Sequence, residues 1–336
     1  MRAIAFDEFG GPEVLRPVEI PVPEPTGDQV RVAVRAAAVN ASDWKTRSGI
    51  LTFGDNRFPQ YPGWEVAGTV DALGPDARGF AVGDEVFGWT QAGGYAEYAL
   101  SSALARKPAG LDWADAVALP IAVNTAAKVL AMLRVRAGET LLVNGASGVV
   151  GSMAVQLAVA AGVTVIGTAC ERNQDLVRAL GAIPTTYGDG LADRVWALAP
   201  HGVDAVFDTA QHGGLPAAIA LRGDTGRIIA IADFAAAQLG VVAAALHGVD
   251  AVYDAFRCAE SVVGYSGTWL GESAADCPPG RPLVDLAGKV AEDIRSGKFR
   301  LAGPARTFRL EHAALAHQEM EHGHGTGKVV LLINRP

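Results

Sequence analysis

The stretch that decides the fold is LLVNGASGVVG, residues 141–151. An apolar run ends at Asn144, three glycines follow in a G-x-x-G-x-x-G pattern, and the apolar segment 152–161 predicts a helix. A strand, a glycine turn and a helix start are what a dinucleotide pyrophosphate requires. The absent side chains let the backbone approach the phosphates, and the N–H groups of the first helical turn face the negative charge. Because glycine is frequent in this chain, 40 residues in 336, the alternative is an ordinary strand-to-helix turn.

The composition is that of a globular chain with a substantial core, since half of the residues are hydrophobic and 19% are charged. A net charge of −8 argues against nucleic acid or an anionic membrane surface as the main partner. We expect no membrane-spanning helix, because no apolar run is long enough, and no signal peptide, because the N-terminus MRAIAFDEFG carries acids early. Cys170, Cys258 and Cys277 form no C-x-x-C pair and indicate reduced, cytoplasmic thiols.

The pattern of strands and helices changes near residue 121. Residues 1–120 predict mostly short strands separated by Pro and Gly, as in a barrel-like fold; the alternating valines of 30–34 are one example. From 121 to 266, strands and helices alternate, which predicts a parallel, doubly wound sheet with its ligand at the carboxyl ends of the strands. Within it, the Ala-rich stretch 234–259 predicts a long helix with a break near Gly248. The tail, 267–336, predicts amphipathic helices and a closing strand that packs back on the N-terminal region.

Six segments, in this order, resemble the medium-chain dehydrogenase/reductase superfamily in its zinc-independent quinone oxidoreductase branch, and the resemblance extends over nearly the whole chain. They are AVNASDWKTRSG (38–49), YPGWEVAGTVDALGPDARGFAVGDEVFG (61–88), GGYAEYAL (93–100), ALPIAVNTA (118–126), NGASGVVG (144–151) and GTGKVVLLI (325–333). The resemblance implies an α/β chain with a GroES-like β-barrel catalytic domain, residues 1–120 and 267–336. It also implies a doubly wound Rossmann NADP-binding domain, residues 121–266, and a homodimer formed through the strand 261–265.

Two departures from the superfamily's pattern argue against metal chemistry. The zinc-dependent relatives carry a Cys where this chain has Asn40 and a His where it has Trp64. No cysteine precedes Cys170 and no histidine occurs in the first 200 residues. Since zinc sites need thiolate or imidazole ligands, we predict no metal site in the N-terminal domain.

The cofactor predicted from these residues is NADPH. In dinucleotide folds, an acid about 20 residues past the glycines binds the ribose 2′-OH of NAD, and here Cys170 falls near that place. Arg172 follows and can bind a 2′-phosphate through two parallel hydrogen bonds, with Thr168 adding a hydroxyl. Glu171 is the opposing observation, so NAD stays open.

The predicted cofactor-binding residues come from the glycine turn, from the ends of the following strands and from the resemblance. They are Asn40, Thr125, Gly145, Ala146, Ser147, Gly148, Val149, Val150, Gly151, Thr168, Cys170, Arg172, Asn173, Tyr187, Thr209, Ala210, Ile231, Ala232, His324 and Lys328.

The predicted catalytic residues are Asn40, Lys45 and Thr125. The resemblance places Asn40, Asp43 and Thr125 around the nicotinamide and substrate pocket, where the Asn40 amide can orient a carbonyl or a water. Asp43 is expected to cap a short helix or to pair with Arg47. Lys45 stands where relatives often have a tyrosine; it can donate a proton or hold an anionic group, and the alternative is an exposed lysine.

These residues and the resemblance imply hydride transfer from NADPH to a quinone or an α,β-unsaturated carbonyl without a metal. A quinone is favoured, because its product anion is stabilised by the ring and no strong acid/base pair is visible. Two alternatives stay open: an enoyl or alkenal reductase of a biosynthetic pathway, and a low-turnover NADPH-binding sensor or structural protein. The sequence does not identify the physiological acceptor.

Overall fold

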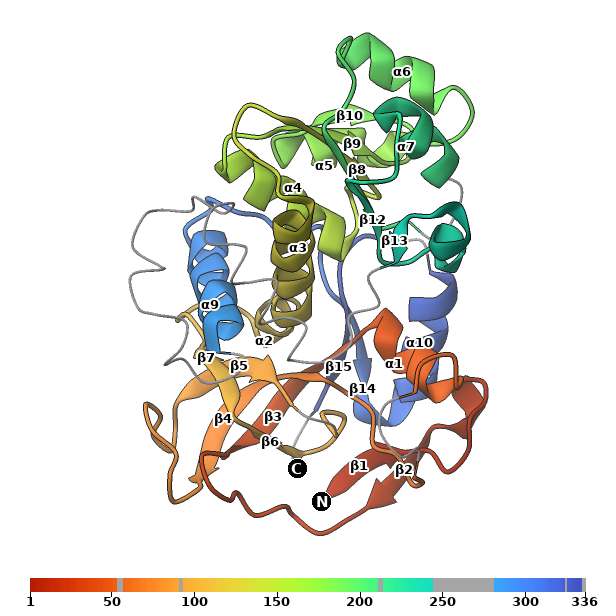
Figure 1. The fold of residues 1–336 in the computed structure, drawn as a ribbon. Coiled ribbons are helices and arrows are strands. Elements are labelled where there is room, and N and C mark those ends of the chain that lie inside the picture. Colours follow the sequence, from red (N-terminus) through yellow and green to blue (C-terminus); the bar gives the residue numbers. More distant parts are fainter. Residues whose placement is uncertain (53–56, 91–92, 211–213, 244–280, 324, 334–336) are drawn as a thin grey trace. The chain divides into compact units, whose positions relative to one another are not determined.

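The computed structural model describes residues 1–333 except 53–56, 91–92, 211–213, 244–280 and 324 (Figure 1). The chain divides into two compact units. Unit 1 consists of Met1–Ile121, Leu283–Lys298 and Gly303–Pro336, and unit 2 consists of Ala122–Pro282 and Phe299–Ala302. The sequence predicted boundaries at 120 and 267; the structure begins unit 2 at Ala122 and adds the short segment Phe299–Ala302 to it.

Unit 2 is built on a parallel sheet. Among the described residues its strand order is β10-β9-β8-β11-β12-β13. The chain runs from the central β8 outward to β10 and then returns to place β11 on the other side of β8, so the crossover direction reverses between β8 and β11. This arrangement confirms the doubly wound sheet, whose ligand site is expected at that reversal. The strands are β8 (Thr140–Asn144), β9 (Thr164–Thr168), β10 (Ile183–Thr185), β11 (Ala205–Asp208), β12 (Ile228–Ala230) and β13 (Val242–Ala243).

Helices connect these strands and cover the sheet, as short αβ repeats require. Helix α4 packs on β8 and β9, α5 on β10, and α7 on β11 and α6. The middle of each central strand is apolar, so Leu142, Ile166 and Val206 are fully buried in one core. The helices are α3 (Pro120–Leu133), α4 (Val149–Ala160), α5 (Gln174–Ala179), α6 (Leu191–Leu198) and α7 (Leu215–Arg222), with 3-10 turns η2 (Glu171–Asn173) and η3 (Phe234–Leu239).

Unit 1 is built on a largely antiparallel sheet. In the described part of the chain its order is β14-β15-β3-β4-β5-β7, with β6 also paired to β3. The closing strand β15 pairs with β3, so that Val329 lies opposite Val39, which confirms that the tail returns to the N-terminal region. The strands are β3 (Val30–Val39), β4 (Glu65–Leu73), β5 (Glu85–Trp89), β6 (Tyr98–Ser101), β7 (Ala103–Arg106), β14 (Arg306–Arg309) and β15 (Val329–Leu332), and a separate hairpin joins β1 (Arg2–Ala5) to β2 (Arg16–Glu19).

Each of the two tail segments of unit 1 contains one α-helix, α9 in the first and α10 in the second. Helix α9 buries Val284, Ala287, Val290 and Ala291 along one stripe, the spacing of an amphipathic helix. Helix α10 packs against α1 and β15. The helices are α1 (Ala41–Arg47), α2 (Trp113–Val117), α9 (Arg281–Arg295) and α10 (Ala313–His322), with 3-10 turns η1 (Pro12–Val14) and η4 (Leu310–His312).

The predicted helix over 234–259 is wrong in its described part. A 3-10 turn, η3, is followed by Gly240 in the left-handed region at φ +71°, and the chain then forms β13, which pairs in parallel with β12. Pairing with β12 therefore outweighs the local helix preference of the alanines. Residues 244–259 and the strand expected at 261–265, with the dimer contact assigned to it, lie outside the described residues.

The sequence expectation that no apolar stretch is long enough to span a membrane is also corrected. The helical stretch Trp113–Leu133, which contains α2 and α3, is long and apolar enough by length and composition. Its most apolar window is 89% buried inside the protein, as is typical of a core helix.

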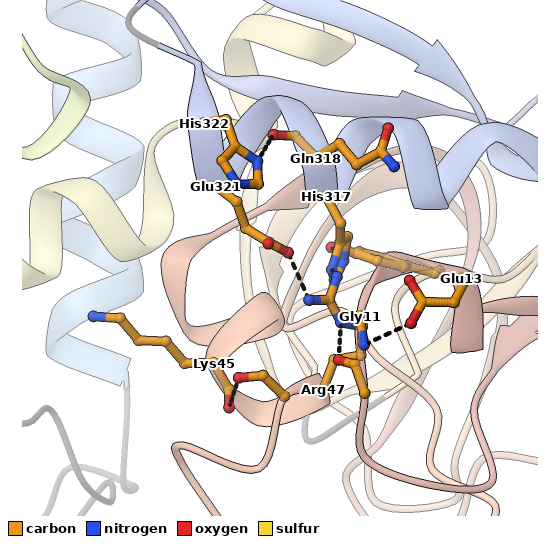
Figure 2. Close-up of polar contacts among 11 residues, drawn as sticks. Gly11, Glu13, Lys45, Arg47, His317, Gln318, Glu321 and His322 are labelled. Atoms are coloured by element: carbon orange, nitrogen blue, oxygen red, sulfur yellow. Dashed lines mark hydrogen bonds and ion pairs between the residues drawn. The ribbon is translucent and has the colours of Figure 1, made fainter.

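Arg47 ties the end of helix α1 to helix α10. Its guanidinium lies between His317 and Glu321 (Figure 2), 3.3 Å from His317 Nδ1 and 2.6 Å from a Glu321 oxygen, and it also donates to the Gly10 carbonyl. The Arg47 side chain is 2% exposed. Burial and the nearby Arg47 charge lower the pKa of His317 to about 3, so this imidazole stays neutral and can accept from the guanidinium.

We expect Arg47→Ala to destabilise the protein by about 3 kcal/mol or more, because it leaves the inward carboxylate of Glu321 without its cation. The exposed pair of Arg16 with Asp7 supplies the matched control, because Arg16→Ala removes an ion pair of similar length from the surface. Thermal and urea unfolding would measure both. Equal midpoints for the two variants would contradict a structural role for the buried pair.

Candidate active site

The glycine turn of unit 2 tolerates no side chains at its two ends. Gly145 has φ +77°, and a Cβ there would lie 2.6 Å from Thr209 Oγ1. A Cβ on Gly151 would lie 2.2 Å from the Gly145 carbonyl oxygen. Helix α4 begins at Val149, directly after Gly148, so the N–H groups of its first turn have no partner within the helix. The turn is thus a backbone cradle that fits a phosphate.

Side chains from the neighbouring strand ends hold this turn in shape. The Gly145 N–H donates to Thr168 Oγ1 at 3.1 Å, and the Ala146 N–H donates to the Thr168 carbonyl at 2.9 Å. The Thr209 hydroxyl donates to the Asn144 carbonyl at 2.7 Å. The structure therefore brings together three predicted stretches, 144–151, 168 and 209, at the carboxyl ends of β8, β9 and β11.

The residues predicted to recognise the adenosine end follow β9. Cys170 precedes the 3-10 turn η2, which contains Arg172, and Arg172 is exposed. Asn173 reaches back to the glycine turn, where its Nδ2 donates to Ser147 Oγ at 3.2 Å. Tyr187 lies two residues past β10 and is 62% exposed. This exposed arginine next to the glycine turn fits a phosphorylated ribose.

The remaining predicted cofactor residues of unit 2 lie after strands β11 and β12 and in helix α3. The Ala210 N–H donates to Asp208 Oδ1 at 2.8 Å, and the Ile231 N–H donates to the Asp208 carbonyl at 3.0 Å. Burial raises the pKa of Asp208 to about 6. Thr125 is 1% exposed, and its hydroxyl has no hydrogen-bond partner among the described residues, so it can bind a polar ligand. Ala232 follows β12, and His324 lies outside the described residues.

In unit 1, Asn40 belongs to a buried polar triangle with Glu65 and Lys328. The Lys328 ammonium donates to Asn40 Oδ1 at 2.5 Å and to Glu65 Oε2 at 3.0 Å. Asn40 Nδ2 donates to the same Glu65 oxygen at 2.7 Å. The other Glu65 oxygen accepts the Ile121 N–H at 2.6 Å. All three side chains of the triangle are buried, with Glu65 wholly inaccessible.

Sequence reasoning missed Glu65, and it assigned Lys328 to the cofactor without predicting its bonds to Asn40 and Glu65. Glu65 is an acid among apolar neighbours at the start of β4, in GWEVAG, and a buried charge in such a position was the available signal. Lys328 precedes β15, and its described bonds run to Asn40 and Glu65. Its pairing with residues 288 and 263 positions earlier has no local signature.

Asp43 caps α1, which confirms one of its two expected roles. Its Oδ2 accepts the Asn40 N–H at 2.6 Å, whereas Arg47, the other expected partner, forms its ion pair with Glu321. Burial raises the pKa of Asp43 to about 7, with the Glu65 charge adding to the rise and the Asn40 N–H and Lys328 opposing it. Burial and the charge of Asp43 also raise the pKa of the Tyr95 hydroxyl, which contacts His317 Nε2 at 3.3 Å.

Lys45 corrects the expectation of an exposed lysine. It is 6% exposed on α1, burial lowers its pKa, and its ammonium lies 5.8 Å from the centre of the Trp44 ring. Figure 2 shows its side chain extending away from Arg47. A buried lysine can bind an anion or transfer a proton more readily than a solvated one, because desolvation brings its pKa toward neutrality.

Comparison with known proteins identifies the family. Residues 26–109 match the alcohol dehydrogenase GroES-like domain, and residues 189–331 match the zinc-binding dehydrogenase domain. The mouse quinone oxidoreductase is 32% identical over 346 aligned residues, which cover 99% of this chain and 98% of the mouse protein. This chain belongs to the quinone oxidoreductase family. The predicted family is confirmed, and so is the fold class of a GroES-like domain with a Rossmann domain.

Other relatives extend the similarity. The chloroplastic NADPH-dependent alkenal/one oxidoreductase of Arabidopsis thaliana is 31% identical, over 98% of this chain and 79% of that protein. Among solved structures, the quinone oxidoreductase from Coxiella burnetii superposes with a TM-score of 0.77 at 28% identity over 99% of each chain. A mycobacterial protein complexed with NADPH gives the same TM-score and identity, over 99% of this chain and 100% of its own.

The pKa of Asp43 predicts a pH dependence of stability. Because the folded pKa is raised, the native state binds the proton more tightly than the unfolded chain does. The stability of the wild type relative to Asp43→Asn is therefore greatest below about pH 4 and declines up to about pH 7, by at most about 1.4 kcal/mol per pH unit. Urea unfolding at pH 5, 6, 7 and 8 would measure this difference, with the exposed Asp189→Asn as control. If the free energies of unfolding of wild type and Asp43→Asn changed in parallel with pH, the raised pKa of Asp43 would be refuted.

Proposed function

We propose that this chain is an NADPH-dependent oxidoreductase that reduces quinones or α,β-unsaturated carbonyls without a metal. The observation that carries the proposal is the glycine cradle at the start of α4, supported by similarity to quinone oxidoreductases over 99% of the chain. Bound NADPH supplies the hydride. The residues of the chain bind and orient the two reactants and keep water from the reacting atoms.

We assign NADPH rather than NADH on the residues after β9. Arg172 is exposed in η2, and Asn173 connects this turn to Ser147 of the glycine cradle. Cys170, in place of a ribose-binding acid, does not repel a 2′-phosphate. The NADPH complex of the mycobacterial relative and the name of the Arabidopsis relative support the same choice. Glu171 is the residue that opposes it.

Asn40, Lys45 and Thr125 are the proposed catalytic residues. Asn40 offers an amide for the acceptor carbonyl, Thr125 has a buried hydroxyl without a described partner, and Lys45 is a buried ammonium. A quinone requires little acid catalysis because the ring delocalises the anion that hydride addition leaves. An enone also requires a proton at its α-carbon, for which Lys45 or water is the source. We therefore place quinones ahead of enones.

We further propose that the enzyme works in the cytoplasm as a homodimer, with a small molecule rather than nucleic acid or a membrane as its partner. The negative net charge argues against nucleic acid or an anionic membrane as partner, three widely separated cysteines fit reduced thiols, and the family resemblance implies the dimer. Light scattering of the purified protein tests the dimer, and a monomer mass would exclude it.

A panel of acceptors tests the proposed reaction. We expect steady NADPH oxidation with a simple quinone such as 1,4-benzoquinone, slower oxidation with an enone, and little reduction of NADP⁺ by a primary alcohol. Loss of reduced-nicotinamide absorbance is the measurement. Faster turnover with enones would favour the alkenal reductase alternative. Tight NADPH binding without turnover across the panel would favour a sensor, and alcohol oxidation that depends on added zinc would overturn the metal-free assignment.

Replacement of Arg172 tests the cofactor assignment. We expect Arg172→Ala to weaken NADPH binding about 10- to 100-fold and to leave NADH binding unchanged, because charge-assisted hydrogen bonds to the 2′-phosphate are lost. Arg178→Ala is the matched control, since Arg178 is an exposed arginine on α5 paired with Asp175. Quenching of protein fluorescence would give the dissociation constants. Unchanged NADPH affinity in Arg172→Ala would sink the assignment.

A further inference from the structure

The triangle of Asn40, Glu65 and Lys328 determines how the Asn40 amide is turned. A carboxamide has an oxygen and a nitrogen of nearly equal size, and the hydrogen bonds around it decide which is which. Here the oxygen faces the Lys328 ammonium at 2.5 Å and the nitrogen faces the Glu65 carboxylate at 2.7 Å. The flipped amide would set its N–H groups against an ammonium and its oxygen against a carboxylate. Both contacts would be repulsive, so only one orientation is stable.

The triangle closes on itself. The Lys328 ammonium donates to both of the others, and Glu65 Oε2 accepts from both. Glu65 is itself held by the Ile121 N–H on its second oxygen. An amide bound at both ends by a closed ring loses its rotational freedom before any ligand arrives, which is what preorganisation requires.

One N–H of Asn40 is not used by the ring. The amide nitrogen carries two hydrogens, and one of them goes to Glu65. Lys328, bonded to the amide oxygen, withdraws electron density from the group and strengthens the remaining N–H as a donor. The ammonium also neutralises Glu65, a carboxylate that is wholly inaccessible to solvent. Without it, a buried negative charge would lie beside the amide.

We propose that Glu65 and Lys328 are positioning residues that hold the second Nδ2–H of Asn40 as the donor to the acceptor's carbonyl oxygen. The inference rests on the proposed function and assigns the polar contact that the acceptor makes. In the reaction, the C–H bond of the reduced nicotinamide breaks, and the hydride forms a new bond to the acceptor. The displaced electron pair moves to the carbonyl oxygen as an oxyanion, which later takes a proton from water. Asn40 stabilises that oxyanion, and Lys328 keeps Glu65 from repelling it.

Lys328→Met tests the positioning role through the separation of kcat from KM. We expect kcat to fall about 100-fold, the loss typical of one oxyanion donor, whereas the KM for the quinone changes less than about twofold. Lys328→Arg retains a cation and donors and should recover part of kcat. Lys107→Met is the matched control, because Lys107 is another buried lysine of unit 1, paired with Glu85, and its loss should leave kcat unchanged.

The double variant Glu65→Gln/Lys328→Met covers the case in which the single variant fails to fold. It removes both buried charges together, so no unpaired carboxylate remains to destabilise the protein. We expect it to fold and still to show a kcat reduced at least tenfold. A wild-type kcat in this folded variant would overturn the proposal and leave the triangle a structural feature only.

Ionisation of bound 4-nitrophenol supplies a readout that does not depend on turnover. The phenolate absorbs visible light and carries its charge on an oxygen, as the reduced acceptor does. With NADP⁺ present, we expect the wild type to lower the pKa of the bound phenol, and Asn40→Ala and Lys328→Met to reverse that change. If none of the acceptors in the panel led the wild type to oxidise NADPH, the proposed function would fail. The phenol titration would still test whether Asn40 donates a hydrogen bond to a bound oxyanion. A wild type that left the phenol's ionisation unchanged would overturn the positioning role itself.

Discussion

The need to neutralise a buried lysine connects the most distant parts of unit 1. Lys328 is 6% exposed, and an ammonium at that depth is stable only beside a carboxylate and further acceptors. Glu65 and Asn40 satisfy it, one from the start of β4 and the other from the residue before α1. Lys328 directly precedes strand β15, which pairs with β3, so the same pairing that returns the tail to the sheet also brings Lys328 to the polar triangle.

Buried polar and charged groups that need partners hold helix α1 at both of its ends. Its N-terminus is capped by Asp43 and preceded by Asn40, which belongs to the triangle. Its C-terminus ends in Arg47, whose buried guanidinium is neutralised by Glu321 of α10. A helix of only seven residues has little stability of its own, so these contacts hold it in place. The tail of the chain therefore supplies both partners, Lys328 and Glu321, that fix the segment next to Asn40, the proposed donor to the substrate.

Unit 2 depends on a different constraint, which is the close approach of backbone to backbone. The Gly145 carbonyl leaves no room for a Cβ on Gly151, and Thr168 and Thr209 bond the turn from the neighbouring strands. The cradle is therefore rigid before a phosphate binds. Apolar packing stabilises the sheet, and hydrogen bonds at the carboxyl ends of the strands fix the shape of the glycine turn. The two units therefore form their candidate sites in different ways: unit 1 pairs buried charges, and unit 2 omits side chains.

The sequence by itself determined the features that lie within a few residues of one another. The glycine turn, the alternation of strand and helix, the Asp43 cap and the lack of Cys and His in the N-terminal part were all readable, because each depends on local backbone geometry or on residue type. The tertiary structure alone decided the partners of Asn40 and Arg47, the burial of Lys45, and the pairing of Val242–Ala243, as β13, with β12 where a helix was expected. Those outcomes depend on packing between residues that are distant in the chain, and packing overrides local preference wherever it buries a charge or completes a sheet.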